Sequence, residues 1–426
     1  MKKVLFIVYY FPPMGGSGVQ RPLKFVKYLP QFGWQPVVIA PEPGAYHTFD
    51  ESLQNELDDL KVDVHRVAAK TPFHLLGNKS REISFIPEKI ASMLRQVSSF
   101  FWLPDNKTGW INPAVTKAEE LWANERFDLI FSTAAPYSNH LIAAALGQKY
   151  NVPVVMDFRD EWLESHLITY PTRSHRTRMA NIERECLSHA DLLTVVSQPM
   201  KESFERRLPK PIPVEVLPHG YDPDDFADIN KNGSDLSCSN KFRILYSGML
   251  YGENDPRNFF KTVAELLSEK PEYKDKISLI FQGGLDSQYQ KVVDEYGLTP
   301  IVQDLGYLPH KQAVENLYSA DLLWLLLAFK HKTQSVTVGK LFEYMATEKP
   351  ILGILKDGAM TNILKDYGAG FLAKPDDIAS IKEALLKLIR LWEQSKLPSG
   401  SKSVIQQYNR KNITEKLAAL FDGFVS

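Results

Sequence analysis

The sequence predicts an α/β protein built from two doubly wound, parallel-sheet domains. Short apolar segments alternate with helical segments in two separate series, one in each half of the chain. A polar, proline-rich stretch at 209–240 lies between the two series. The length of 426 residues exceeds what one hydrophobic core usually supports, so two domains are expected.

The first half opens with an apolar segment, residues 4–10, that we predict to be a buried strand. The opening residues MKKVLFIVYYFPP also imitate a signal peptide, but the apolar run is short and has no small-residue cleavage site. A glycine-rich loop and a helix at 19–32 follow. Further strands are predicted at 36–40, 129–132, 152–158 and 192–196, with helices at 139–149 and 177–188. Continuously apolar strands of this kind are typical of parallel sheets covered on both faces.

The second half repeats this pattern from the strand at 242–247 and the helix at 257–267. Its further strands are predicted at 277–281, 301–305, 322–327, 351–354 and 370–372, with helices at 311–318 and 338–347. A second doubly wound unit is therefore expected.

These patterns place a first domain at 1–215, a linker at 216–240 and a second domain at 241–402. The tail at 403–426 is predicted to be helical and to pack back on the first domain. Open α/β sheets bind ligands beyond the carboxyl ends of their strands. We therefore expect two sheets facing across a cleft, with the chemistry in the loops that follow strands.

Composition excludes several classes of protein. The formal net charge of −1 argues against wholesale binding of nucleic acid, which needs an excess of basic residues. The two cysteines, Cys186 and Cys238, have no metal-ligand spacing and are predicted to be free thiols in a reducing compartment. No run of about 18 apolar residues occurs, so no transmembrane helix is expected. The predicted location is the cytoplasm, with the inner face of the cell membrane as an option.

The stretch at 334–355, QSVTVGKLFEYMATEKPILGIL, predicts a loop, an amphipathic helix and a buried strand. The helix places Lys340 and Glu343 one turn apart on the same side. Its N-terminus suits a phosphate, and Glu343 can accept hydrogen bonds from the vicinal hydroxyls of a ribose. The alternative is a solvated surface pair of opposite charge.

A second candidate site is the loop FPPMGGSG at 11–18, which joins the first strand to the first helix. Gly15, Gly16 and Gly18 permit close backbone approach to an anion. The loop is neither a GxGxxG fingerprint nor a P-loop. Gln20 and Arg21, at the start of the helix, add polar groups for a phosphate or a sugar. A tight turn without a ligand is the alternative.

Two further groups follow strands of the first half. His140 lies near a helix start, where a neutral imidazole facing the cleft can support charge at a reacting centre; a capping or surface role is as plausible. Asp157, Arg159 and Asp160 cluster where a strand leaves the core. Arg159 pairing both carboxylates is a structural option, while Asp160 is favoured as an acceptor-binding group or base.

In the second half, Gly248 follows the opening strand and Arg257 begins the next helix, where one cation can neutralise a diphosphate. An ordinary solvated arginine is the alternative. The basic run at 330–332 is interpreted as a solvated loop. The aromatic and basic segment at 81–110 is interpreted as a loop with core-packing aromatics, with a lipid-contacting insertion as the alternative.

Together these segments resemble retaining glycosyltransferases of the GT-B architecture, in the large family four group. The resemblance covers nearly the whole chain, and the order and spacing of its motifs make it specific. It is carried by YFPPMGGSGVQR at 10–21, DFRDEW at 157–162, ADLLTVVS at 190–197, VLPHGYD at 216–222, YSG at 246–248, LGYLPHKQAVENLYSADLLWLL at 305–326 and GKLFEYMATEKPIL at 339–352.

The resemblance implies two Rossmann-like domains with the sugar nucleotide held mainly by the second. Glu343 matches the family's ribose-binding glutamate, and Lys340 and Arg257 lie where the family offers cations to the diphosphate. The glycines of the first loop and Gly248 match positions near the diphosphate, and His140 falls near a catalytic-region histidine. One position departs from the pattern, because Ser335 replaces a glutamate that normally helps to hold the donor sugar.

The predicted function is transfer of a sugar from a nucleotide-sugar donor to a carbohydrate or lipid-linked acceptor, with retention of configuration, in cell-surface polysaccharide or glycolipid synthesis. His140 and Asp160 are the predicted catalytic residues, and Gln20, Arg21, Asp157 and Arg159 the predicted acceptor-side or supporting ones. No metal and no cofactor is expected, and peripheral membrane contact is an option. A sugar-nucleotide epimerase and a catalytically silent binding protein of the same fold remain alternatives, and a dehydrogenase is least favoured.

Overall fold

The structure is a computed structural model that describes residues 1–44, 49–69, 100, 102–165, 168, 170–227, 229, 241–250, 254–328 and 333–425. It divides into two compact units. Unit 1 comprises Met1–Pro218 and Arg410–Ser426, and unit 2 comprises His219–Asn409. No helix in these described ranges is long and apolar enough to cross a membrane.

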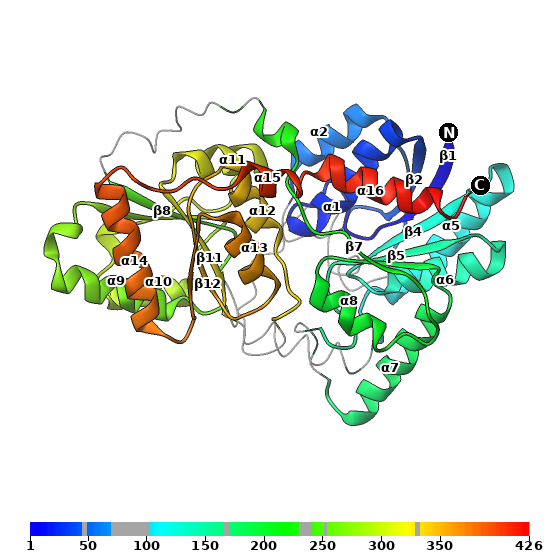
Figure 1. Ribbon diagram of the computed structural model, residues 1–426. Helices are drawn as coiled ribbons and strands as arrows, with labels where there is room; N and C mark the ends of the chain where they lie inside the picture. The colour runs from blue at the N-terminus through cyan, green and yellow to red at the C-terminus, as the bar shows by residue number, and fades with distance from the viewer. Residues whose placement is uncertain are drawn as a thin grey trace. The chain divides into compact units, whose positions relative to one another are not determined.

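Unit 1 is built on a seven-stranded sheet with the strand order β3-β2-β1-β4-β5-β6-β7, in which every neighbouring pair is parallel (Figure 1). The strands are β1 (Lys2–Ile7), β2 (Trp34–Pro41), β3 (Asp63–Val67), β4 (Leu129–Ala134), β5 (Val154–Phe158), β6 (Leu192–Val195) and β7 (Val214–Val216). The helices are α1 (Ser17–Tyr28), η1 (Leu29–Phe32), α2 (Glu51–Leu60), η2 (Thr108–Trp110), α5 (Ile111–Asn124), α6 (Ser138–Tyr150), α7 (Arg173–Ser188), α8 (Gln198–Glu205) and α16 (Arg410–Asp422).

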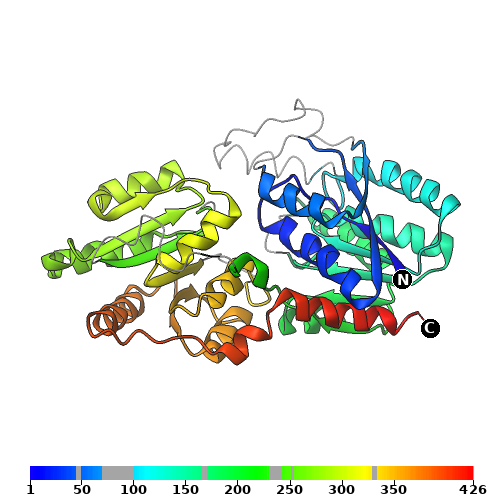
Figure 2. The ribbon, with the colours of Figure 1, turned by 90° about the horizontal axis from the view of Figure 1, so that it is seen from above.

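Both faces of this sheet are buried, which explains why its strands carry apolar side chains at successive positions. Along β1, Leu5 and Ile7 belong to one buried cluster, whereas Val4 and Phe6 belong to another. Successive side chains of a strand point to opposite faces, so each strand supplies both clusters. The covering helices lie on either side of the sheet (Figure 2).

The C-terminal helix completes the core of unit 1. α16 runs beside α1 (Figures 1 and 2). Phe421 packs on Trp34 with ring centroids 5.2 Å apart, and the Trp34 indole N–H donates to Asp422 Oδ1 at 3.0 Å. The last helix is thus part of the fold of the first unit.

Unit 2 has a six-stranded sheet with the order β10-β9-β8-β11-β12-β13, again with all neighbours parallel. The strands are β8 (Phe242–Ser247), β9 (Ile277–Gln282), β10 (Val302–Asp304), β11 (Leu322–Leu327), β12 (Ile351–Leu355) and β13 (Gly370–Ala373). The helices are η3 (Pro223–Phe226), α9 (Arg257–Glu269), η5 (Pro271–Tyr273), α10 (Ser287–Glu295), η6 (Thr299–Ile301), α11 (His310–Ser319), α12 (Gly339–Ala346), α13 (Ala359–Tyr367), α14 (Ile378–Glu393) and α15 (Lys402–Gln406).

The predicted fold class of two doubly wound parallel sheets is confirmed. Sequence patterns missed β3 and β7, the two edge strands of unit 1. β3 contains three polar residues and only two valines, and β7 has only three residues. Neither contains the apolar run that identified the central strands, because an edge strand has fewer neighbours to bury it.

Candidate functional site

Both sheets reverse their strand order at one place, between β1 and β4 in unit 1 and between β8 and β11 in unit 2. Loops beyond the carboxyl ends of the strands at such a switch point form the usual ligand site of an open α/β sheet. The predicted site residues therefore form two groups, one in each unit, and each group is described within its own unit.

In unit 2, the loop after β8 lies against the start of α12. Gly248 has a φ of +107°, and a Cβ placed on it would lie 3.0 Å from Lys340 Nζ. The same ammonium donates to Tyr246 Oη at 2.9 Å and lies 4.1 Å from the Tyr246 ring centroid. Only glycine allows both this backbone conformation and this close approach of the lysine.

Burial shapes the chemistry of Lys340. Loss of solvation lowers the pKa of its ammonium to about 7, although the carboxylate of Glu343 acts in the opposite direction. An anion placed beside the ammonium would restore its charge. Glu343 lies one turn further along α12, is partly exposed, and makes no hydrogen bond or ion pair within the described part of the chain. Its carboxylate is thus available to a ligand hydroxyl.

Several residues that the sequence patterns missed hold this arrangement together. The Ser247 N–H donates to Tyr344 Oη at 2.7 Å, which fastens the end of β8 to α12. Gly283, at the end of β9 with a φ of +112°, packs so closely that an added Cβ would lie 2.6 Å from the Gly248 carbonyl carbon. A glycine pair one residue beyond a predicted strand was the signal available for this contact.

Arg257 does not join this group. It is the first residue of α9, its side chain is half exposed, and its Nη1 pairs with Asp255 Oδ2 at 2.9 Å. This geometry matches the ordinary solvated arginine that the sequence left open.

In unit 1, Arg21 and Asp157 form a fully buried ion pair. Arg21 donates from Nε and Nη2 to the two Asp157 oxygens at 3.0 and 2.7 Å, and also to the carbonyls of Leu217 and Pro218. Thr133 and Thr194 donate to the same carboxylate. Burial alone would raise the pKa of Asp157, but the Arg21 charge and these hydrogen bonds hold it below its usual value.

This ion pair replaces the structural alternative in which Arg159 pairs with Asp157. The ion-pair partner of Asp157 is Arg21 rather than Arg159. Arg21 donates its hydrogen bonds to Asp157 and to backbone carbonyls within the protein. The pair joins α1, β5 and the exit of β7. The ion pair therefore links these three elements within unit 1.

Arg159 connects three loops through backbone oxygens. It donates to the carbonyls of Ala134 and Ala135 at 2.9 and 2.7 Å, and to the carbonyl of Gly18 at the start of α1. Gly18 packs closely against this side chain, since an added Cβ would lie 3.3 Å from Arg159 Nη1. The next residue, Asp160, is partly exposed, and no hydrogen bond or ion pair engages its carboxylate among the described residues. Asp160 thus has no hydrogen-bonded partner among the described residues, although its charge favours the charged form of Arg159.

The glycine loop after β1 ends at the N-terminus of α1. Gly16 is the exposed N-cap with a φ of +94°, and no side chain caps the helix. Gly15 is buried, and Gln20 is 6% exposed. Gly16 thus presents the N-terminal end of α1 to solvent, whereas Gln20 faces the interior.

His140 is located in the core rather than at an open surface. Its side chain has no exposed area, Nδ1 hydrogen-bonds Ser132 Oγ at 2.7 Å, and its ring packs 4.3 Å from that of Phe158. Burial lowers the pKa of the imidazole to about 3, so the ring is neutral. The expectation that this ring faces a cleft does not hold, because α6 begins at Ser138 and turns residue 140 towards β4 and β5.

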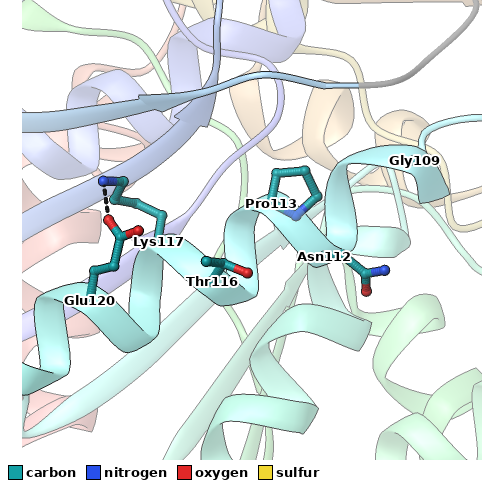
Figure 3. A pocket seen from close by; sticks show the side chains of 6 residues that line it. All are labelled: Gly109, Asn112, Pro113, Thr116, Lys117 and Glu120. Carbon is teal, nitrogen blue, oxygen red and sulfur yellow. Dashed lines mark hydrogen bonds and ion pairs between the residues drawn. The ribbon is translucent and has the colours of Figure 1, made fainter.

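Other candidate features fall outside these groups. The basic run at 330–332 and most of the segment at 81–110 lie outside the described residues. A shallow pocket on unit 1 is lined by one face of α5 and by Gly109 of η2, and in it Lys117 pairs with Glu120 (Figure 3). It contains none of the predicted site residues. Within the described ranges, no group of three or more histidine, cysteine or acidic residues could hold a metal ion.

Comparisons with known families cover both units. Residues 21–225 match the family model described as Glycosyltransferase Family 4, and residues 230–399 match the one described as Glycosyl transferases group 1. The two matches leave out only 1–20, 226–229 and 400–426. No curated protein sequence matches the chain at a significant level.

Solved structures similar to this chain share its fold over their whole length. Sucrose-phosphate synthase from Thermosynechococcus elongatus is 15% identical, with a TM-score of 0.67 and 99% of each chain covered. Anabaena Alr3699/HepE in complex with UDP-glucose is 15% identical, with a TM-score of 0.66, covering 99% of this chain and 100% of the other. The lipopolysaccharide outer core galactosyltransferase WaaB is 14% identical, with a TM-score of 0.58 and 99% of both chains covered.

Proposed function

The chain is a glycosyltransferase, and we propose that it moves a sugar from a nucleoside-diphosphate donor to a carbohydrate or lipid-linked acceptor with retention of configuration. One observation carries the proposal. A partly buried lysine, a positive-φ glycine and a glutamate lie at the switch point of unit 2, where an open α/β sheet binds its ligand. The glutamate has no hydrogen bond or ion pair among the described residues. In this reading unit 2 holds the donor.

The residues suit a diphosphate leaving group. Lys340, beside Gly248, supplies a cation to the phosphate oxygens, and the start of α12 supplies backbone N–H groups. Glu343 accepts hydrogen bonds from the ribose hydroxyls. As the bond between the sugar and the diphosphate breaks, negative charge grows on the leaving oxygen, and a fixed cation lowers the energy of that state. This use of the side chains needs no metal ion.

In the same reading unit 1 receives the acceptor. Asp160 supplies a carboxylate with no hydrogen bond or ion pair among the described residues, and Arg159 fixes the loop that carries it. The acceptor oxygen bonds to the anomeric carbon on the same face from which the diphosphate leaves, which retains the configuration. Asp160 orients the acceptor hydroxyl and takes up its proton, while the diphosphate leaves as an anion. We assign His140 a structural role, as a neutral side chain packed in the core of unit 1.

UDP is the first donor nucleotide to test, because Anabaena Alr3699/HepE, which shares the fold, was solved with UDP and with UDP-glucose. Binding of UDP, GDP, ADP and CDP is measured by calorimetry, with and without EDTA. We expect one nucleotide to bind in both conditions, and Lys340→Ala and Glu343→Ala each to weaken it roughly 10–100-fold, the usual cost of a lost charge-assisted hydrogen bond.

Two exposed residues of α10 serve as matched controls, since Lys291→Ala and Glu295→Ala remove the same charges far along the chain from the site. Equal affinity in wild type and in both site variants would contradict the donor site. Loss of binding on addition of EDTA would contradict metal independence.

Product analysis then separates the reaction classes. With the bound sugar nucleotide and a panel of glycan and lipid-linked acceptors, we expect free nucleoside diphosphate and a new glycosidic bond whose anomeric configuration, read by NMR, equals that of the donor. An isomerised sugar nucleotide without any acceptor would indicate an epimerase. Donor binding with no product would indicate a silent binding protein. Ser335, which replaces the family's glutamate, is the sequence feature that supports this alternative.

A further inference from the structure

Two opposite charges lie near each other on α12 without forming an ion pair. Lys340 and Glu343 are three residues apart, a spacing at which lysine and glutamate side chains commonly pair on a helix surface. No ion pair joins them within the described part of the chain, and Glu343 acts on Lys340 only as a more distant charge. A contact with another element therefore determines the direction of the ammonium.

Tyr246, at the end of β8, supplies that contact. Lys340 Nζ donates to Tyr246 Oη at 2.9 Å and lies 4.1 Å from the centroid of the same ring. The hydroxyl accepts this hydrogen bond, and the negative face of the ring attracts the ammonium in addition. Nζ then lies 3.0 Å from the position that a Cβ on Gly248 would take, which places the charge against the loop after β8.

The core of unit 2 holds Tyr246 in place. The side chain is 1% exposed, and its ring packs on that of Trp324 with centroids 5.2 Å apart. Burial raises the pKa of the phenol, with a hydrogen bond from Asn254 opposing the shift, so the hydroxyl stays protonated and neutral. Asn254 is itself joined to the end of β11 by two hydrogen bonds to the backbone. The acceptor that Lys340 uses is thus fixed from two strands.

We propose that Tyr246 is a positioning residue of the donor site, whose hydroxyl directs the Lys340 ammonium towards Gly248 and away from Glu343. Both charges then meet the donor without an ion pair to break. A lysine paired with Glu343 would have to leave that partner before it bound a diphosphate, and the paired carboxylate would accept less well from ribose hydroxyls. Because the Tyr246 hydroxyl is neutral, it orients the ammonium without neutralising it.

This inference rests on the proposed donor role of Lys340 and Glu343, and it adds the group that keeps them apart. Glu343 is the one charged group among the described residues that acts on Lys340. The tyrosines packed around the ammonium stay neutral, because burial raises the pKa of Tyr246 and of Tyr344. A change in the pKa of Lys340 therefore reports its distance from Glu343.

The first test measures Lys340 in the full chain without nucleotide. Trace acetic anhydride reacts only with the neutral amine, so mass spectrometry of the labelled protein across pH gives the pKa of Lys340. Tyr246→Phe keeps the ring but removes the acceptor, so the ammonium should turn to Glu343. Its pKa should then rise above the wild-type value of about 7, and its reaction at about pH 8 should slow about tenfold. Tyr246→Phe/Glu343→Gln should not differ from Glu343→Gln.

The second test measures nucleotide binding by calorimetry in a double-mutant cycle. Tyr246→Phe should weaken binding about tenfold when Glu343 is present, but by no more than about twofold in the Glu343→Gln background. A merely structural role of the hydroxyl would give the same loss in both. Tyr367→Phe is the matched control, because it removes another buried hydroxyl of unit 2, one that donates to the Lys349 carbonyl at 2.7 Å. It should change neither the pKa of Lys340 nor the affinity.

The outcomes separate this inference from the donor site itself. An unchanged or lower pKa of Lys340 in Tyr246→Phe, or equal losses of affinity in the two backgrounds, would overturn the positioning role and leave the donor site in place. Equal nucleotide affinity in wild type and in Lys340→Ala would contradict the donor site instead. The labelling experiment would still show whether Tyr246 keeps the two charges apart, because it needs no nucleotide.

Discussion

Lys340 shows how burial prepares a single side chain for a ligand. Its ammonium lies between the Tyr246 ring and Gly248, and burial lowers its pKa to about 7, with Glu343 opposing the shift. A lysine that titrates near neutral pH is an unusual surface feature but a common property of binding sites. The cost of holding this charge in the empty site becomes a gain when a diphosphate binds.

This coupling makes a prediction for pH. A bound diphosphate favours the charged ammonium and raises its pKa, so binding takes up a proton above pH 7. We expect donor affinity to be highest below pH 7 and to fall up to about tenfold per pH unit above it, the limit for one coupled proton. Calorimetry in buffers of different ionisation enthalpy measures that uptake. Lys340→Met should abolish it, and an unchanged uptake in the variant would assign the proton to another group.

The stability of unit 2 should rise with pH, whereas the affinity for the donor falls. Unfolded Lys340 has an ordinary lysine pKa of about 10.4, so the unfolded state binds more protons than the native state between pH 7 and 10. The contribution of this group therefore becomes more favourable as pH rises through that interval. Lys340→Met removes the cost and should raise the free energy of unfolding at pH 7 by about 1 kcal/mol.

His140, in contrast to Lys340, is a polar side chain that packs in the core and does not face a ligand site. We expect His140→Ala to cost about 2–4 kcal/mol of stability, because it leaves a cavity and removes the partner of Ser132. Its pKa of about 3 in the fold lies below the ordinary value of 6.5, so protonation of the unfolded state favours unfolding as pH falls from 6.5 towards 3. Denaturant titrations at several pH values should therefore show that the free energy of unfolding falls less between pH 6.5 and pH 3 in His140→Gln than in wild type. A large fall in kcat with unchanged stability would support the catalytic role instead.

At the scale of elements, the buried Arg21–Asp157 pair ties α1 to β5 and to the exit of β7. Removing one partner leaves an uncompensated buried charge, so Arg21→Met or Asp157→Leu alone should cost about 3–5 kcal/mol. The double variant Arg21→Met/Asp157→Leu should lose much less than the sum of the two. Urea unfolding of the four proteins in a double-mutant cycle measures the coupling, and additive losses would contradict a direct tie.

Arg159 also links elements of unit 1, through hydrogen bonds to backbone carbonyls. Its guanidinium holds the carbonyls of Gly18, Ala134 and Ala135, and so fastens the loops that follow β1, β4 and β5. Asp160 directly follows Arg159 in the loop after β5. Packing of this edge thus depends on a charged side chain whose hydrogen bonds go to carbonyl oxygens. Burial lowers the pKa of Arg159, and the charges of Asp160 and Asp157 oppose that shift.

At the scale of the whole molecule, each unit has its own buried core. The four apolar clusters of the described residues divide evenly, with two in unit 1 and two in unit 2. Phe421 belongs to unit 1 although it lies near the end of the sequence. The chain therefore leaves unit 1 once and returns to it.

Separate cores predict two transitions in calorimetric unfolding. Phe421→Ala should cost about 3–5 kcal/mol in unit 1 and lower the Tm of that transition by about 2–4 °C per kcal/mol, leaving the other in place. The bound nucleotide should raise only the transition of unit 2. A matched exposed change in α16, Lys416→Ala, should move neither. One transition that responds to both the variant and the nucleotide would indicate a single cooperative body.

Much of this architecture could be predicted from sequence because it depends on local pattern. The central strands β8 and β11 have the bounds expected from their apolar runs, and α12 begins one residue from its predicted start. Two series of buried strands require two covered parallel sheets whatever their side-chain contacts are. The positions of the glycine loop and of Lys340 and Glu343 after strands follow from the same pattern.

Only the tertiary structure decided which partner each polar side chain meets. Arg21 reaches Asp157 across 136 positions, Lys340 reaches Gly248 across about 90, and His140 turns inward instead of towards a ligand. Sequence spacing gives the face of a helix but not the element packed against that face. The sequence by itself thus determined two doubly wound units and the loops that carry their chemistry, while packing determined which groups in those loops are free to act.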